Sequence, residues 1–395
     1  MFTTYRNIFT SKGSFSFSMA GLIARLPSSM MTLSIITMLE RELGNYTIPG
    51  IIAGIFAFTL ALSSPVIARF SDIYGQGRVG IIFGTSSLLA SLLFLFNLYL
   101  NGPLFILFIL VFIMGFKPNY GAFVRTRWSE IFRGKKQLHT AFSFEAVIDE
   151  IVFIIGPALA VYLSVNMFSS AGLLAALFFL STGGLWFCLQ TNSEPKIKNT
   201  LKISPKPLIY MPSIQIIFLI TVAVGTIISS CELVSVAFAN KIGDPAKASY
   251  ALVAYAVASL ISGLLFGMVK WKKPLNEQLM LFTIAVLLLA IPPLFVNSLW
   301  QLILALFLAG FACAPLLICC FSVVEKISPP AQLTEGIAYE GSGIGIGVAL
   351  GSITSGRLID LMGAQYGFLI AIIASAAALL LLFLTSNKLK KALDN

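Results

Sequence analysis

Charged residues are scarce in this chain of 395 residues: they make up 11% of it, whereas hydrophobic residues make up 58%. An average soluble domain carries about 25% charged residues. The composition therefore excludes a soluble globular protein. A mean hydropathy of +0.93 is typical of an integral membrane protein.

Residues that commonly serve catalysis or metal binding are also few. The only histidine, His139, lies in a basic segment with no nucleophile or metal ligand near it in sequence. The five cysteines lie in or beside apolar runs without metal-ligand spacing, so we interpret them as small packing residues. No glycine-rich nucleotide-binding loop is present. We therefore expect no enzyme activity, no metal, no other cofactor and no use of ATP by this chain.

Long apolar runs are abundant, and about 20 such residues are enough to cross a bilayer as a helix. The sequence thus predicts an all-α membrane protein with twelve transmembrane helices. The expected spans are about 15–38, 48–69, 79–100, 103–124, 141–165, 169–190, 213–238, 248–269, 278–297, 299–323, 334–357 and 366–386.

The two halves of the chain resemble each other. Residues 141–163 and 336–358 match at an offset of 195, which places Glu340 at the position of Glu145. The stretch between the halves contains four lysines and four prolines, as is typical of a linker. We expect two pseudo-symmetric six-helix bundles, 1–190 and 213–395, joined by a cytoplasmic linker at 191–212.

Basic residues are distributed unevenly over the predicted loops. Of the 26 lysines and arginines, twenty fall on one side of the membrane and four on the other. Basic loops stay on the cytoplasmic side, so we expect a multi-pass protein of the cell (inner) membrane with both termini in the cytoplasm. The net charge of +10 is explained by these loops and requires no nucleic-acid partner. We expect a monomer whose partners are membrane lipids, protons and a small-molecule substrate.

The loop after the second predicted span reads ARFSDIYGQGRVG. It resembles the signature between helices two and three of the major facilitator superfamily, Gly-x-x-x-Asp-Arg/Lys-x-Gly-Arg-x-Arg/Lys. Asp72, Gly75 and Arg78 match, whereas Ala68 replaces the leading glycine and two non-basic residues replace basic ones. The resemblance implies a twelve-helix transporter fold in which Asp72 and Arg78 help to close the cytoplasmic mouth. It also implies that Arg78 pairs with Glu130.

The second half retains part of this pattern. Glu325 follows Glu130 at the 195-residue offset, and Lys270, Lys272 and Lys273 are its possible partners. Simple anchoring at the cytoplasmic face is the alternative role for these lysines. The expected cytoplasmic gate comprises Asp72, Gly75, Arg78, Glu130, Glu145, Glu325 and Glu340.

Several charges fall inside predicted spans, where they are costly and must face protein or water. At 1.5 Å per residue, Arg25 lies about 13 Å, Lys117 about 10 Å and Asp149 about 12 Å from the cytoplasmic end of its span. We predict that Asp149, alone or together with Glu150, carries a coupling proton and that Arg25 or Lys117 competes with the proton for this carboxylate. Structural pairing alone is the alternative. The expected substrate and proton-coupling residues are Arg25, Lys117, Asp149, Glu150 and Glu232.

These features favour a secondary active transporter that moves a small organic solute by alternating access, with protons as the coupling ion. Gly156 and Pro157 resemble part of an antiporter signature, so efflux antiport is preferred. An uptake symporter, a uniporter or a lipid translocase on the same scaffold are the alternatives. The intramembrane cations suggest an anionic substrate, whereas Glu232 and the acids near residue 149 suggest a cation or zwitterion.

Overall fold

The computed structural model describes residues 2–43, 47–196, 206–241, 248–269 and 271–394, and all regular elements in these ranges are helices. The first half contains α1 (Phe2–Ile8), α2 (Ser14–Leu43), α3 (Thr47–Tyr74), α4 (Gln76–Tyr99), α5 (Leu104–Met114), α6 (Tyr120–Phe132), α7 (Gln137–Asn166) and α8 (Ala171–Cys188). The second half contains α9 (Pro212–Lys241), α10 (Ala248–Met268), α11 (Leu275–Ala290), α12 (Leu299–Ile327), α13 (Leu333–Met362) and α14 (Phe368–Asp394). Short 3-10 turns lie at Thr191–Ser193, Leu208–Tyr210, Pro292–Phe295 and Ala364–Gly367.

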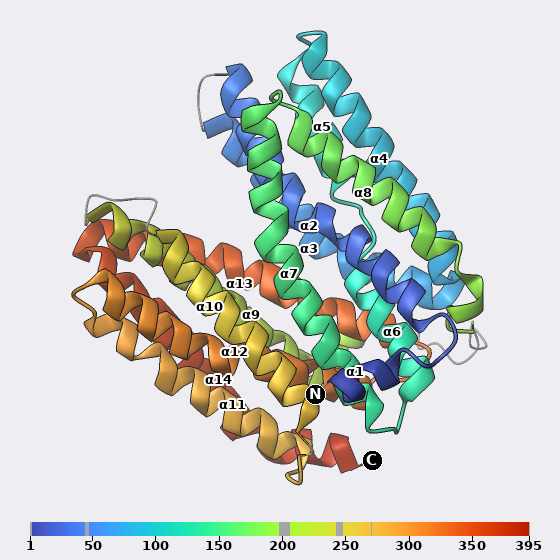
Figure 1. Cartoon of the computed structure of the whole chain (residues 1–395), viewed down its shortest axis with the longest axis vertical. Helices are drawn as coiled ribbons and strands as arrows, with labels where there is room; N and C mark the ends of the chain where they lie inside the picture. Colours follow the sequence, from blue (N-terminus) through green and yellow to red (C-terminus); the bar gives the residue numbers. More distant parts are fainter. Residues whose placement is uncertain (1, 44–46, 197–205, 242–247, 270, 395) are drawn as a thin grey trace.

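Eleven helices in the described ranges are long and apolar enough to cross a membrane, and α5 is a shorter apolar helix. The predicted all-α membrane fold of the twelve-span type is therefore confirmed. Figure 1 shows α2 to α8 gathered in one bundle and α9 to α14 in another. The exact domain boundary at 191–212 stays a prediction.

The fourth predicted span is not one continuous helix. The chain leaves the helix after Met114 and re-enters it at Tyr120. Pro118 has no N–H to donate and disfavours helical geometry at Lys117, which precedes it. The side chain of Asn119 then begins α6 by accepting a hydrogen bond from the N–H of Ala122 at 3.1 Å. Consequently α6 continues to residue 132, well past the expected end at 124.

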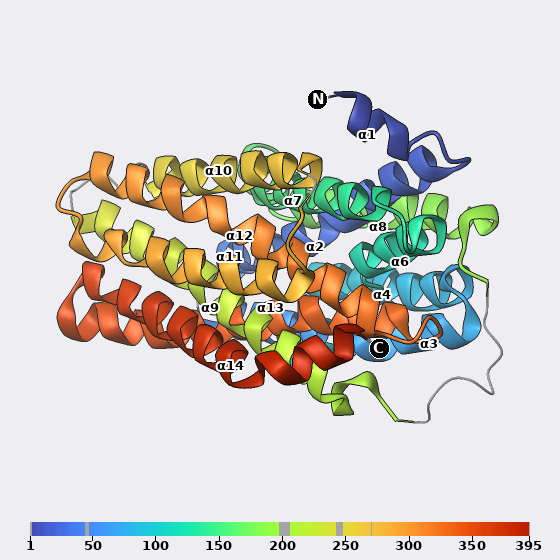
Figure 2. The ribbon, with the colours of Figure 1, turned by 90° about the horizontal axis from the view of Figure 1, so that it is seen from below.

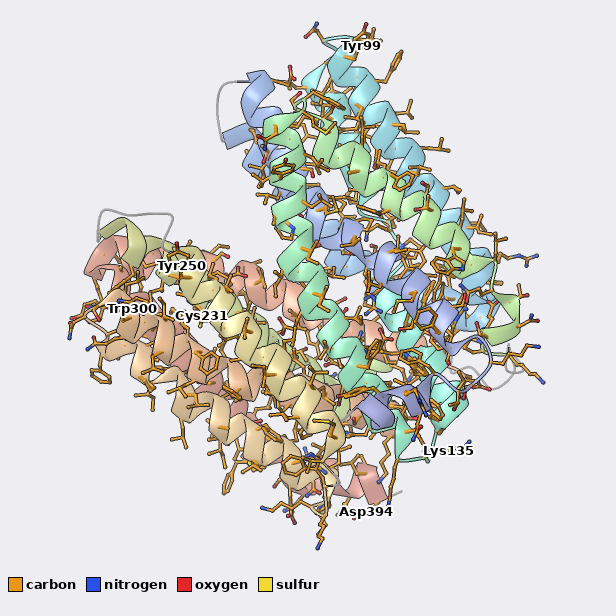
Figure 3. The ribbon with its side chains drawn as sticks, in the orientation of Figure 1. Tyr99, Lys135, Cys231, Tyr250, Trp300 and Asp394 are labelled. Carbon is orange, nitrogen blue, oxygen red and sulfur yellow. The ribbon has the colours of Figure 1, made fainter. Side chains whose placement is uncertain are left out.

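The two bundles meet along α3 and α13 on one side and along α7 and α10 on the other. Figure 2 shows α7 beside α10 from a second direction. The bundles lie close together at one end and diverge toward the other (Figure 1). Figure 3 marks the close end by Lys135 and Asp394, and the divergent end by Tyr99, Tyr250 and Trp300. We call the close end the basic end, because the loop at 133–136 and the lysine-rich C-terminus lie there.

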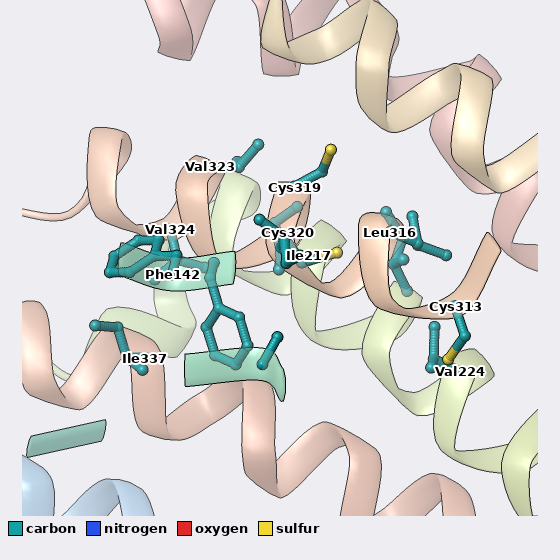
Figure 4. Close-up of a cluster of buried hydrophobic side chains, with 14 of the residues drawn as sticks. Phe142, Ile217, Val224, Cys313, Leu316, Cys319, Cys320, Val323, Val324 and Ile337 are labelled. Atoms are coloured by element: carbon teal, nitrogen blue, oxygen red, sulfur yellow. The ribbon is translucent and has the colours of Figure 1, made fainter. Parts of the chain in front are cut away.

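All five cysteines are buried and free. Figure 4 shows Cys313, Cys319 and Cys320 of α12 among apolar side chains such as Phe142 and Ile217. This agrees with their interpretation as packing residues. Since Phe142 belongs to α7, the same apolar cluster also joins the two bundles.

Candidate substrate and proton-coupling site

Backbone carbonyls of α10 hold the first half at the basic end. The hydroxyl of Tyr5 donates to the carbonyl of Leu264 at 2.7 Å, and the ring Nε2 of His139 lies 2.9 Å from the carbonyl oxygen of Phe266. Burial raises the pKa of Tyr5 to about 12, so its hydroxyl remains a donor at neutral pH. These bonds tie α1 and α7 to the end of α10.

Asp72 joins α3 to the start of α13. Its carboxylate accepts hydrogen bonds from the backbone N–H groups of Thr334 at 3.2 Å and Glu335 at 2.9 Å. The first turn of a helix carries unpaired N–H groups and partial positive charge, which suits a carboxylate. Asp72 thus contacts the other half of the molecule, as a closing contact at this end requires.

The other residues of the signature loop are placed as follows. Gly75 has φ of +93° between α3 and α4, a conformation that favours glycine. Arg78 and Glu130 both have exposed side chains. Their pairing stays a prediction.

Glu325, near the end of α12, pairs with an arginine of the opposite half. Arg133 Nε lies 2.7 Å from Glu325 Oε1, and Arg133 also donates to the backbone carbonyl of Glu325 at 3.1 Å. Among the described residues Glu325 pairs with Arg133, just after α6, and not with Lys272 or Lys273, which were expected as possible partners. Lys270, the third expected partner, lies outside the described residues. A longer contact of 3.6 Å joins Arg69 to Glu335.

Deeper in the molecule, Arg25 of α2 binds two carboxylates of α7. Its Nη2 forms an ion pair with Glu145, and its Nη1 lies 2.7 Å from Asp149 Oδ1. Residues four apart lie on one helical face, so α7 presents both acids to α2. The side chain of Arg25 is 6% exposed, which excludes the alternative of an arginine that extends to the membrane surface. The predicted contact between Arg25 and Asp149 is present.

Arg125 of α6 is the second cation on Asp149. Its Nη2 lies 2.5 Å from Asp149 Oδ2, and its guanidinium carbon lies 3.8 Å from the ring centre of Phe321 on α12. The fourth predicted span ends at residue 124, which leaves Arg125 in the loop that follows. That placement is wrong: Arg125 and Arg127 are 3% and 0% exposed. The extension of α6 beyond its Asn119 cap explains why both arginines lie in the interior.

Glu145 belongs to this interior group. Besides Arg25, its carboxylate accepts hydrogen bonds from Ser18 Oγ and Trp128 Nε1, each at 2.7 Å. It is fully buried. Glu145 therefore has its hydrogen-bonding capacity well satisfied, and it lies in the central site instead of at the basic end.

Lys117 differs from the two arginines. It is fully buried at the break between α5 and α6, and its Nζ donates to Ser28 Oγ at 2.6 Å. Among the described residues, no carboxylate lies within ion-pair distance of it. The expectation that Lys117 competes for Asp149 is wrong, because its side chain turns toward α2 and Arg125 occupies that place.

Glu340 of α13 faces this group from the other half. It is 1% exposed, and neither carboxylate oxygen has a hydrogen-bond partner in the part of the chain that the structure describes. The charges that act on it are those of Arg125 and Asp149. We call Arg25, Arg125, Glu145, Asp149 and Glu340 the central charged network, and Lys117 is a separate buried cation.

The two remaining predicted acids lie outside this network. Glu150 accepts a hydrogen bond from Ser259 of α10 at 2.6 Å, which joins the two halves. Glu232 has an exposed side chain on α9.

The side chain of Asp149 is 30% exposed despite its position in the middle of α7, so solvent reaches the network. Buried ionisable groups that face a protein interior typically mark substrate or proton pathways.

The sequence profile of the Major Facilitator Superfamily matches residues 17–239 and 217–394. The chain belongs to this superfamily. The resemblance carried by the Asp72 loop is thereby confirmed. Membership of this superfamily indicates a transporter. No curated protein matches the sequence.

Solved structures support the same fold. The human organic anion transporter MFSD10 (TETRAN) is 14% identical with a TM-score of 0.74, over 93% of this chain and 98% of that one. A bacterial homologue of the iron transporter ferroportin, in an outward-facing state, is 15% identical with a TM-score of 0.74, over 95% and 99%. The E. coli fucose:proton symporter FucP is 11% identical with a TM-score of 0.69, over 93% and 97%. At such identities the likeness shows the fold alone.

Proposed function

We propose that this protein is a proton-coupled secondary transporter for a small organic anion. We also propose that the structure represents its outward-facing state. The central charged network supports this proposal, because it lies in the interior where α6 and α7 of one half meet α12 and α13 of the other. Alternating access requires a site at such a junction, with the two halves moving about it. The protein works as a monomer.

The outward-facing assignment follows from the basic end. If this end is cytoplasmic, as the loop charges suggest, the contacts of Asp72 and Arg133 close the cytoplasmic side. The bundles then diverge toward the outside (Figure 1).

The membrane orientation can be tested with single cysteines, because the native ones are buried. Cysteines at Tyr99 and Trp300, whose side chains are 83% and 78% exposed, should react with a membrane-impermeant maleimide in intact cells. Cysteines at Lys135 and Asp394 should react only after permeabilisation. Labelling at Lys135 in sealed cells would place the basic end outside and reverse the assignment.

Lys117 supports an anionic substrate. The two arginines are satisfied by Glu145 and Asp149, whereas Lys117 has only a serine hydroxyl. An unpaired buried ammonium is costly, and a carboxylate, sulfonate or phosphate of the substrate offsets that cost. The MFSD10 structure, titled as an organic anion transporter, is consistent with this chemistry.

A thermal-unfolding panel of organic anions, cations and neutral solutes tests this substrate class. A ligand at 100 times its Kd stabilises the native state by about 2.7 kcal/mol. We expect stabilisation by anions alone, and its loss in Lys117→Met, while the exposed control Lys135→Met keeps it. Equal stabilisation of Lys117→Met and wild type, or stabilisation by cations alone, would contradict the assignment.

The direction of transport stays a prediction. Efflux antiport rests on Gly156 and Pro157, but a Cβ at residue 156 would lie 1.9 Å from Ser29 Oγ. Close packing of α7 against α2 therefore accounts for this glycine. Joint movement of a proton and an anion is the second candidate, favoured by the excess cation that Lys117 contributes.

A further inference from the structure

Glu340 and Arg125 carry complementary unused hydrogen-bonding groups. Within the described residues, both oxygens of Glu340 lack a donor and the Nε of Arg125 lacks an acceptor, although all three atoms are buried. Buried polar atoms are nearly always paired, so each such exception needs a physical explanation. Here the unused donor and the unused acceptors belong to opposite halves, on α6 and α13, which pack against each other.

The internal repeat shows that two of the three partners of Glu145 have no polar counterpart near Glu340, whereas the third, Ser18, corresponds to Ser213. Glu145 is held by Arg25 and Trp128. The residues 195 positions after these two partners are Ile220 and Val323, and both are buried. The second half thus has a carboxylate at this position but apolar residues in place of its cation and its indole donor. A structural ion pair does not account for Glu340.

An ionised carboxylate without any hydrogen-bond donor is strongly disfavoured in a protein interior, and protonation removes most of that cost. The groups close enough to act on Glu340 electrostatically are Arg125 from α6, Asp149 from α7 and the thiol of Cys320 from α12. Arg125 is bound to Asp149 at 2.5 Å, so it does not neutralise Glu340 in this arrangement.

We propose that Glu340 binds the coupling proton in the outward-facing state, and that after proton release it takes Arg125 as its ion-pair partner across the two halves. This inference rests on the proposed function and assigns the proton to Glu340 instead of Asp149. In the release step the O–H bond of Glu340 breaks and the proton passes to water. The carboxylate then accepts the free N–H of Arg125, while Asp149 keeps Arg25.

The charge balance links this step to the substrate. With Glu340 protonated, the network together with the separate buried cation Lys117 has three positive charges, on Arg25, Arg125 and Lys117. They stand against the two carboxylates Glu145 and Asp149. When Glu340 is protonated, an anionic substrate restores neutrality. When Glu340 is deprotonated, its own carboxylate restores neutrality without the substrate. Proton and anion therefore favour the same state, which is the condition for thermodynamic coupling between them.

The test uses the full-length protein in lipid nanodiscs and infrared difference spectra between low and high pH. Wild type should show the carbonyl band of a protonated carboxyl group that disappears as pH rises. Glu340→Gln should lose this band, whereas Glu150→Gln should keep it. Persistence of the full band in Glu340→Gln, or its loss in Glu150→Gln, overturns the assignment.

Spin labels at residues 99 and 300 give a second readout. Since glutamine mimics the protonated acid, Glu340→Gln should keep the low-pH distance distribution at every pH, whereas wild type changes. Glu340→Met serves the same comparison if the glutamine variant does not fold. If wild-type transport is proton-driven but Glu340→Gln titrates as wild type does, this inference fails and the proposed function stands. If wild-type transport ignores protons, the proposed coupling itself fails.

Discussion

Replacing Asp149 with asparagine is expected to abolish proton-driven accumulation of the solute while leaving exchange of solute across the membrane measurable. Asp149 binds Arg25 and Arg125 at 2.7 and 2.5 Å, so its charge sets where both cations lie. Without it, Arg125 loses its ion-pair partner among the described residues, and Glu340 is the carboxylate that we propose takes that place. The arginine then no longer alternates between the halves, and proton release is no longer tied to their movement.

The same substitution should lower stability, because removing one partner of a buried ion pair costs about 3–5 kcal/mol. Transport in proteoliposomes, with Asp394→Asn as an exposed control, separates coupling from folding. Accumulation driven by a pH gradient at the wild-type level, with unchanged pH dependence, would show that Asp149 is only a structural partner of the two arginines.

Replacing Asp72 with asparagine should shift the protein toward the inward-facing state. The carboxylate accepts two N–H groups at the start of α13, and hydrogen bonds to a charged group contribute about 1.5–3 kcal/mol. The loss of such a contribution changes the ratio of the two states about 10- to 100-fold, since 1.4 kcal/mol corresponds to a factor of ten. Spin labels at residues 135 and 394 should move apart, and those at residues 99 and 300 should approach.

A matched control for this substitution is Glu277→Gln, which removes an exposed carboxylate in the first turn of α11. It should leave both distance distributions unchanged. Wild-type distributions in Asp72→Asn would mean that Asp72 does not hold the basic end closed.

Hydropathy and the internal repeat were sufficient to predict the fold and one of the central contacts. Arg25 and Asp149 could be matched because each lies at a countable depth in a continuous helix. The contact of Arg125 could not be predicted in this way. A charged residue lowers the hydropathy of a segment equally whether its side chain is solvated or buried, so the predicted span stops before it. The break at Lys117 and Pro118 divides the predicted span into two helices, so the second helix ends later than one continuous helix would. In the sequence, only the capping residue Asn119 indicated that a second helix begins there.

The repeat identified Glu340 as the counterpart of Glu145 but placed both at the gate. Whether a buried carboxylate has partners depends on how α6 packs against α13, which involves residues more than 200 positions apart in the sequence. The replacement of Arg25 and Trp128 by apolar residues in the second half was the signal in the sequence for this difference.

Paired measurement of solute and proton movement tests the central claim most directly, using the anion found by the thermal-unfolding panel and wild-type protein in proteoliposomes. An imposed pH gradient should move the anion against its own gradient, and an imposed anion gradient should move protons. A protonophore should abolish the first effect. If the anion equilibrates at the same rate and to the same extent with and without a pH gradient, and no protons move with it, proton coupling through the central charged network is contradicted.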